Sequence, residues 1–164
     1  MKTLLLIRHA KASWDDPSMK DFDRPLNDRG KKDAPSMAQR LQAKKVIPDI
    51  LVSSTAKRAK STALIMAREL GYGEEKILWK PELYHGGIAI HMEVVSGIDD
   101  RFDTAALISH NPGISIFADS LTPYQLDHIP TCGIFAVKVH ANSWARFQAA
   151  EKEMFFFEFP KMES

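Results

Sequence analysis

The chain has little of what would tie it to an oxidising compartment, a membrane or a nucleic acid. It contains a single cysteine, Cys132, so no disulfide can form within it. No apolar run approaches the ~20 residues that cross a bilayer, and the run near the N-terminus meets Arg8 too soon for a signal peptide. The net charge of +1 gives no electrostatic reason to expect a nucleic-acid or membrane partner. We therefore expect a cytoplasmic protein that binds neither.

The common signatures of nucleotide and metal chemistry are missing as well. There is no Walker loop, and the glycine-rich turn of a Rossmann nucleotide site is absent after the first apolar strand. His85 and His91 are too far apart for one helical face, and no cysteine or aspartate clusters with them. The sequence therefore predicts neither a metal ion nor a cofactor.

What the sequence does contain is a series of short apolar strands alternating with helical patterns. Leu4 to Ile7 is an unbroken apolar run, typical of a strand buried on both faces. At 164 residues and 45% hydrophobic content, the chain is the size of one domain, 1–164. We expect an α/β fold, a three-layer α/β/α sandwich with a mostly parallel central sheet. The further strands are expected at 49–53, 77–79, 104–108, 134–139 (the last parallel strand) and 154–159 (an aromatic edge strand, with its phenylalanines in the core).

Two histidines and two arginines follow the ends of these strands. Arg8 and His9 come directly after the first strand, and His110 comes just after the strand at 104–108. Arg58 lies in the first turn of the helix that follows 49–53, where a cation opposes the helix dipole unless an anion binds there. The carboxyl ends of parallel strands form the edge at which open α/β sheets bind ligands. A lone histidine in such a position is more often structural, but two of them beside two arginines favour a functional site.

The chemistry that this set favours is phosphoryl transfer without a metal. Guanidinium groups bind phosphate oxygens bidentately and stay charged at any working pH. A neutral imidazole can act as the nucleophile, because free histidine titrates near ~6.5. Phosphoryl transfer is catalysed largely by positioning and by neutralising the equatorial oxygens. The sequence therefore predicts a phosphohistidine intermediate.

Two more side chains are weaker candidates. Arg24 belongs to the long polar segment 11–28, and long connections in compact domains are usually functional or disordered. Glu82 follows the strand at 77–79. The alternative for each is an ordinary solvated loop charge.

Three motifs carry a resemblance to a known family. Leu6-Ile7-Arg8-His9-Ala10 resembles the Arg-His-Gly signature of the histidine phosphatase superfamily, which has the phosphoglycerate mutase-like fold, with Ala10 in place of the usual glycine. Residues 53–63 are similar to its second arginine motif, and residues 109–113 to its second histidine motif. Asp23-Arg24-Pro25-Leu26-Asn27 and His110-Asn111-Pro112 most resemble the SixA-type branch, which acts on protein phosphohistidine.

The resemblance implies roles by matching position. His9 would be the nucleophile, and Arg8, Arg58 and His110 would complete the catalytic phosphate pocket. Arg24 would bind substrate at its rim. Glu82 is the nearest match to the glutamate that serves mutase-like relatives as general acid.

A weak acid motif and a short chain both favour phosphohistidine as substrate. An imidazole leaves a phosphoramidate readily, whereas an alkoxide needs a proton delivered to it. The segment 82–104 leaves little room for an insertion that would fold over a small substrate. We expect a monomer that acts on a phosphorylated signalling protein, such as a histidine-phosphotransfer domain. Two alternatives remain open: a small-molecule phosphomonoesterase or mutase, and a phosphate-binding module without turnover.

Overall fold

The structure is a computed structural model that describes residues 1–160. Its centre is a six-stranded sheet with the order β3-β2-β4-β1-β5-β6. The strands are β1 (Lys2–Arg8), β2 (Ile50–Ser53), β3 (Leu78–Trp79), β4 (Thr104–Ser109), β5 (Ile134–Val139) and β6 (Lys152–Glu158). The strands nearest the middle, β1 and β4, are almost entirely buried, as expected for an unbroken apolar run covered on both faces.

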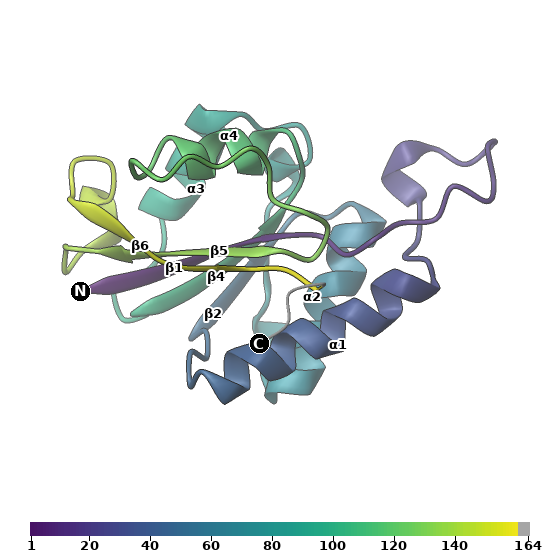
Figure 1. Ribbon diagram of the computed structural model, residues 1–164, viewed down its shortest axis with the longest axis horizontal. Helices are drawn as coiled ribbons and strands as arrows, with labels where there is room; N and C mark the ends of the chain where they lie inside the picture. The colour runs from purple at the N-terminus through teal and green to yellow at the C-terminus, as the bar shows by residue number, and fades with distance from the viewer. Residues whose placement is uncertain (161–164) are drawn as a thin grey trace.

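Helices cover the sheet on both faces (Figure 1). α1 (Asp28–Ala43) and α2 (Lys57–Leu70) pack on one face, and α3 (Ile88–Ser96) and α4 (Gly113–Asp119) pack on the other. Short 3-10 turns complete the chain: η1 (Asp21–Asp23), η2 (Glu74–Lys76), η3 (Pro81–Leu83) and η4 (Trp144–Arg146). The predicted three-layer α/β/α architecture is confirmed. Among the described residues, no helix combines the length and the apolar character that crossing a membrane would require.

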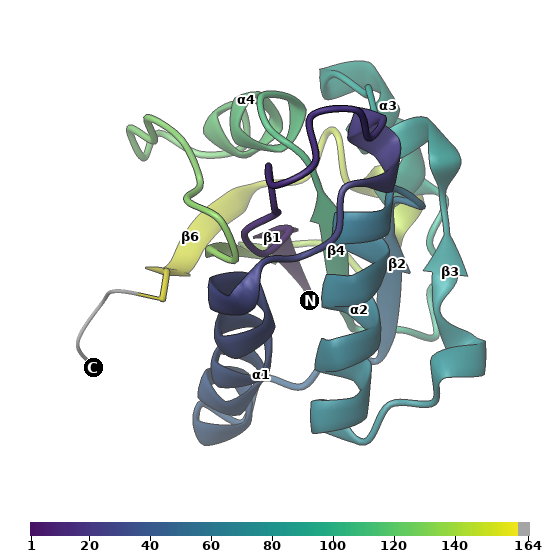
Figure 2. The ribbon, with the colours of Figure 1, turned by 90° about the vertical axis from the view of Figure 1, so that its right-hand side faces the viewer.

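The strand register aligns the ends that carry the candidate residues. β1 and β4 are parallel, with Arg8 opposite Ser109, so His9 and His110 both come immediately after this aligned pair. β2 is parallel to β4 on its other side, with Ser53 opposite Ile108. The loop that leads to Arg58 therefore starts at the same edge. This shared edge faces the viewer in Figure 2.

The prediction that residues 134–139 form a parallel strand is wrong. β5 runs antiparallel to β1, with Ile7 opposite Ile134 and Lys2 opposite Val139. After α4 the chain returns without a further helix or strand, so β5 begins at the edge where His9 lies. There the amide of Cys132 donates to the His9 carbonyl at 3.0 Å. An apolar run predicts burial but carries no information about strand direction.

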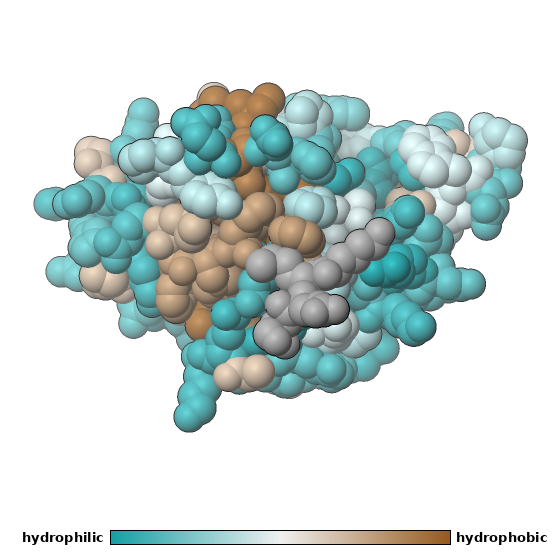
Figure 3. All heavy atoms as spheres, in the orientation of Figure 1, coloured by the Kyte–Doolittle hydropathy of each residue, from teal (hydrophilic) through white to brown (hydrophobic). Residues whose placement is uncertain are grey.

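The last strand, β6, is at the edge of the sheet as expected, but its phenylalanines are not all in the core. The Phe155 side chain is 41% exposed, while Phe156 and Phe157 are half-buried. The ladder between β5 and β6 shifts register at Ala136/Val137. Hydrophobic side chains on this side of the molecule gather over β6 and α4 in Figure 3. The edge position leaves one side of β6 without a neighbouring strand.

The N-termini of α1 and α2 differ in whether a side chain caps them. The Asn27 side chain caps α1 by accepting from the Gly30 amide at 2.9 Å, and the helix continues through Pro35. α2 begins at Lys57 with Ala56 as its N-cap residue and no side-chain cap. The Ser54 hydroxyl contacts the ring of His110.

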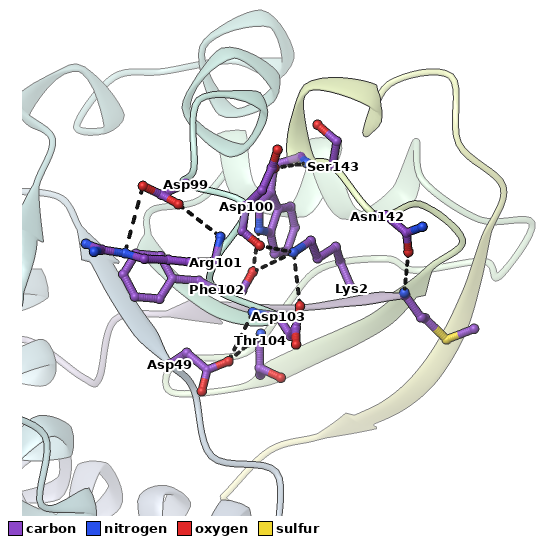
Figure 4. A network of polar contacts seen from close by, with 12 residues as sticks. Lys2, Asp49, Asp99, Asp100, Arg101, Phe102, Asp103, Thr104, Asn142 and Ser143 are labelled. Atoms are coloured by element: carbon purple, nitrogen blue, oxygen red, sulfur yellow. Dashed lines mark hydrogen bonds and ion pairs between the residues drawn. The ribbon is translucent and has the colours of Figure 1, made fainter.

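The opposite edge of the sheet is closed by a polar network around Lys2 (Figure 4). The Lys2 side chain is 3% exposed. Its ammonium donates to the Asp100 and Phe102 carbonyls at 2.5 and 3.1 Å and to Asp103 Oδ1 at 3.0 Å. The indole of Trp144 also donates to the Phe102 carbonyl, at 2.7 Å. The network fixes the loop that enters β4.

Candidate active site

The shared strand edge holds a pocket of about 290 Å³ that contains five of the six candidate side chains. Arg8 and His9 come from β1 and the residue after it, Arg58 from α2, His110 from the end of β4, and Arg24 from the loop after η1. The two imidazole rings lie 5.0 Å apart, centre to centre. The pocket is lined by Arg8, His9, Lys11, Ala12, Trp14, Arg24, Arg58, His110, Asn111 and Thr131.

The hydrogen bonds of His9 fix which ring nitrogen carries the lone pair. Nδ1 lies 2.7 Å from the Ala10 carbonyl, which can only accept, so Nδ1 carries the proton. Nε2 accepts from the Nε–H of Arg58 at 3.3 Å. Burial, followed by the nearby arginines, lowers the pKa of His9 to about 4, although the bond to Ala10 acts the other way. At neutral pH His9 is an uncharged imidazole with its Nε2 lone pair toward Arg58.

Ala10, the departure from the family signature, does not obstruct the pocket. Its methyl group is fully buried in the hydrophobic cluster under α1 and α2, and it is not among the pocket-lining residues. Its amide donates to the Thr62 hydroxyl at 2.9 Å, and that hydroxyl donates to the Arg58 carbonyl at 2.7 Å. These bonds tie the backbone after His9 to the first turn of α2.

The ring of His110 is held by the Ser54 hydroxyl. Its Nε2 lies 2.7 Å from that hydroxyl, whose oxygen also accepts from the Ala56 amide at 3.2 Å. When the hydroxyl donates to Nε2, the ring proton of His110 lies on Nδ1, and this is the tautomer that leaves Nδ1 as a donor. Nδ1 is buried and has no hydrogen-bond partner among the described residues. Burial and the neighbouring His9 lower the pKa of His110 to about 2, so it is a neutral donor.

Within residues 1–160, Arg8 is held by one hydrogen bond and has an unpaired N–H donor. Its Nη1 donates to the Ile129 carbonyl at 3.1 Å, while its buried Nε has no partner in the described part of the chain. Burial and the charge of Arg58 lower the pKa of the guanidinium. Unpaired buried donors are costly, so Arg8 and His110 both favour an acceptor-rich group in this pocket.

Arg24 forms the rim of the pocket. Its guanidinium carbon lies 3.1 Å from the centre of the Trp14 ring, and the Trp14 side chain is 74% exposed. The Nε of Arg24 donates to the Ser13 carbonyl at 3.0 Å, and its Nη1 donates to Asp21 at 3.0 Å. Arg24 is thereby 8% exposed, in contrast to a solvated loop charge.

Glu82 is the one candidate that the structure does not bring to the pocket. It is exposed in η3, is not among the lining residues, and makes no hydrogen bond or ion pair with any of residues 1–160. The residue of this loop that reaches the site is Tyr84. Its ring lies 5.4 Å from that of His110, and its hydroxyl donates to Asp21 at 2.5 Å. A loop tyrosine has no sequence signal that distinguishes it from a surface residue.

A third buried histidine, His91, lies behind this loop. It lies in α3 and is fully buried. Its Nδ1 lies 2.8 Å from the Gly87 carbonyl and its Nε2 lies 2.8 Å from the Ser109 hydroxyl. His91 thus connects α3 to the residue that precedes His110.

Asp21, Tyr84, Ser54 and Trp14 were missed by the sequence reasoning. Asp21 lies three residues before Arg24, and that spacing is its only local signal. Within residues 1–160, no group of three His, Cys, Asp or Glu side chains could hold a metal ion. The assembled groups are instead neutral imidazoles and guanidinium donors, which suit a phosphate-like anion.

Comparison with known proteins agrees with this chemistry. Residues 4–83 match the family model of the histidine phosphatase superfamily (branch 1). An uncharacterized chloroplast protein of Arabidopsis thaliana is 30% identical over 151 residues, which span 87% of this chain and 69% of that protein.

Solved structures show the same fold. A structure of the protein histidine phosphatase SixA with tungstate is 20% identical, with a TM-score of 0.80 over 96% of this chain and 97% of that one. A protein of Agrobacterium tumefaciens assigned as phosphohistidine phosphatase SixA is 23% identical, with a TM-score of 0.79 over 97% and 99% of the two chains. From the matching motifs, the fold and the arginine–histidine pocket, we conclude that the chain belongs to the histidine phosphatase superfamily.

Proposed function

We propose that this phosphatase works without a metal, through a phosphoryl group carried on Nε2 of His9, and that its substrate is phosphohistidine on a signalling protein. The observation that carries the mechanism is the state of His9. Its Nδ1 proton is bonded to the Ala10 carbonyl, its Nε2 lone pair meets the Nε–H of Arg58, and its lowered pKa keeps Nε2 unprotonated at neutral pH. An imidazole in this state is a nucleophile that needs no separate base.

The reaction has two displacements. In the first, Nε2 of His9 forms a bond to phosphorus while the bond from phosphorus to the leaving nitrogen breaks. The leaving ring keeps that electron pair and departs as a neutral imidazole, because its other nitrogen carries a proton. In the second, water attacks the phosphorus, the bond to Nε2 breaks, and the water protons end on phosphate and solvent. Arg8, Arg58 and the Nδ1–H of His110 bind the phosphoryl oxygens in both steps, where charge is spread over three equatorial oxygens.

The pocket favours a leaving group that needs no strong acid. None of its lining residues is a carboxylate. Asp21, whose carboxylate is paired with Arg24 and Arg58, has its pKa lowered, first by the hydrogen bond from Tyr84, so it is ionised and a poor proton donor. A phosphorylated imidazole meets this requirement, because it leaves readily, whereas a serine or sugar alkoxide requires a proton.

The test is the chemical state of His9 after brief exposure to a phosphohistidine peptide in excess EDTA. We expect a phosphoryl label that is acid-labile, that mass spectrometry places on His9, and that is absent from His9→Ala. Replacing the exposed His128 with alanine is the matched control and should leave labelling unchanged.

Three results would count against the proposal. Labelling that EDTA abolished would contradict the metal-independent mechanism. Phosphate binding with no label from any donor would indicate a binding module. Much faster turnover of p-nitrophenyl phosphate than of the phosphohistidine peptide would leave the reaction class intact and overturn the substrate.

A further inference from the structure

Asp21 contacts side chains from three separate parts of the site. It lies in η1, in the segment between β1 and α1 that crosses in front of the strand edge in Figure 2. Its Oδ1 accepts from Arg24 at 3.0 Å, and its Oδ2 accepts from Arg58 at 2.9 Å and from the Tyr84 hydroxyl at 2.5 Å. Its carbonyl accepts from Arg58 as well, at 2.7 Å. One residue therefore joins α2, the loop after η3 and its own loop.

The contacts of Arg58 divide its guanidinium group into two edges. Nη1 and Nη2, which form the outer edge, donate to the carbonyl and carboxylate of Asp21. Nε, on the side edge, donates to Nε2 of His9 at 3.3 Å. A guanidinium can bind an oxyanion bidentately through either edge. Asp21 occupies the outer edge and leaves the side edge facing the nucleophile.

We propose that Asp21 is a positioning residue that holds Arg58 by its outer edge, so that the side edge is directed at a phosphoryl group on or near His9. The proposal rests on the proposed function only in taking the bound group to be phosphoryl. Asp21 does not line the pocket itself, so it lies behind Arg58 rather than in the place of the substrate.

Charge and packing both favour this arrangement. Arg24 and Arg58 each contribute a positive charge at the pocket, and an ionised Asp21 between them offsets their repulsion. The pKa of the Tyr84 hydroxyl is raised, first by burial, so this hydroxyl stays protonated and can donate to Asp21. The Phe22 ring, next to Asp21, packs edge-on against Tyr84 with 5.0 Å between ring centres. The loop is thus held by an ionic and an aromatic contact together.

The experiment measures binding of inorganic phosphate by titration calorimetry, which needs no turnover. We expect Asp21→Asn to weaken binding about tenfold, the size of one lost charge-assisted hydrogen bond. Tyr84→Phe removes only the hydroxyl and should weaken binding less, while keeping its ring contacts. Asp23→Asn is the matched control, because Asp23 is exposed in the same turn and its carboxylate makes no hydrogen bond or ion pair with any of residues 1–160.

A double-mutant cycle separates positioning from a general structural role. In an Arg58→Ala background, Asp21→Asn should cause no further loss of phosphate binding. An equal loss in both backgrounds would overturn the proposal, and so would tighter binding by Asp21→Asn, which would make Asp21 a competing anion. If wild type bound phosphate with this pattern but did not form phosphohistidine, the proposed function would fail and the role of Asp21 would stand.

Discussion

The Nε–H of Arg58 lies 3.3 Å from Nε2 of His9 and donates to it. The contact has two consequences for the resting site. It identifies Nε2 as the unprotonated nitrogen, and it directs a positive charge at the position where a phosphoryl group would be bound. In the proposed phosphoenzyme, where Nε2 is bonded to phosphorus, the same N–H would be released to a phosphoryl oxygen, and Arg58 would serve both forms of His9 from one position.

The depressed pKa values of His9 and His110 predict an acid-sensitive fold. In the unfolded chain both rings titrate near 6.5, whereas in the folded protein the pKa values are about 4 and about 2. Below pH 6.5 the unfolded state binds more protons than the folded state. The free energy of unfolding is therefore highest above pH 6.5, and it decreases as the pH is lowered, by about 1.4 kcal/mol per pH unit for each histidine. Unfolding free energies measured from pH 7 to pH 5 should show this slope. His9→Asn should have a shallower slope, and an identical slope in the mutant would contradict the assignment.

Glu82→Gln should leave catalysis of phosphohistidine hydrolysis within about twofold of wild type, because surface substitutions away from partners have small effects. Glu82 is exposed and contacts none of the described residues that line the pocket. The measurements are kcat, from the rate at saturating substrate, and kcat/KM, from the rate at limiting substrate. Glu93→Gln, an exposed residue of α3, is the control. A loss of tenfold or more confined to Glu82→Gln would show that this carboxylate reaches the leaving group during the reaction.

Ser54→Ala should lower kcat/KM by up to about a hundredfold, the lower end of the loss caused by removing one preorganised donor, because Ser54 acts through His110. Without the Ser54 hydroxyl, Nε2 of His110 has no hydrogen-bond partner, and the ring proton is no longer held on Nδ1. Nitrogen-15 NMR of the imidazole reports the tautomer directly. Thr55→Ala changes the neighbouring residue and should alter neither the tautomer nor the rate. Retention of the Nδ1–H form in Ser54→Ala would refute this role.

Lys2→Met should destabilise the protein without changing its chemistry. The substitution keeps the apolar stem of the side chain but removes the donor for two carbonyls and the Asp103 carboxylate (Figure 4). We expect a loss of about 1–3 kcal/mol, because the Asp100 carbonyl is left without its donor, although the Phe102 carbonyl keeps its bond from the Trp144 indole. Urea denaturation measures it, with the exposed Lys32→Met in α1 as control. An unchanged unfolding free energy would mean that water replaces the ammonium at no cost.

The sequence alone was enough for the layers of the fold and for the central residues of the pocket. The run Leu4 to Ile7 is apolar without interruption because β1 is buried on both faces, so its position could be predicted. Arg8, His9 and His110 follow strands directly, and parallel pairing of β1 with β4 was sufficient to bring them together. The direction of β5 could not be predicted from its apolar residues, because a parallel and an antiparallel strand at this position would be equally buried.

Tertiary structure alone determines the contacts of Asp21, Ser54 and Tyr84. Each is a common loop residue whose partner is distant in the chain, such as Arg58 for Asp21 and His110 for Ser54. Local patterns report what a residue does within its own strand or helix, so the sequence by itself determined the strands, the helices and the histidines and arginines at their ends. Only folding decided which nitrogen of His9 carries a proton, which edge of Arg58 faces His9, and that Tyr84 rather than Glu82 contacts the His110 ring, because these depend on contacts between separate segments.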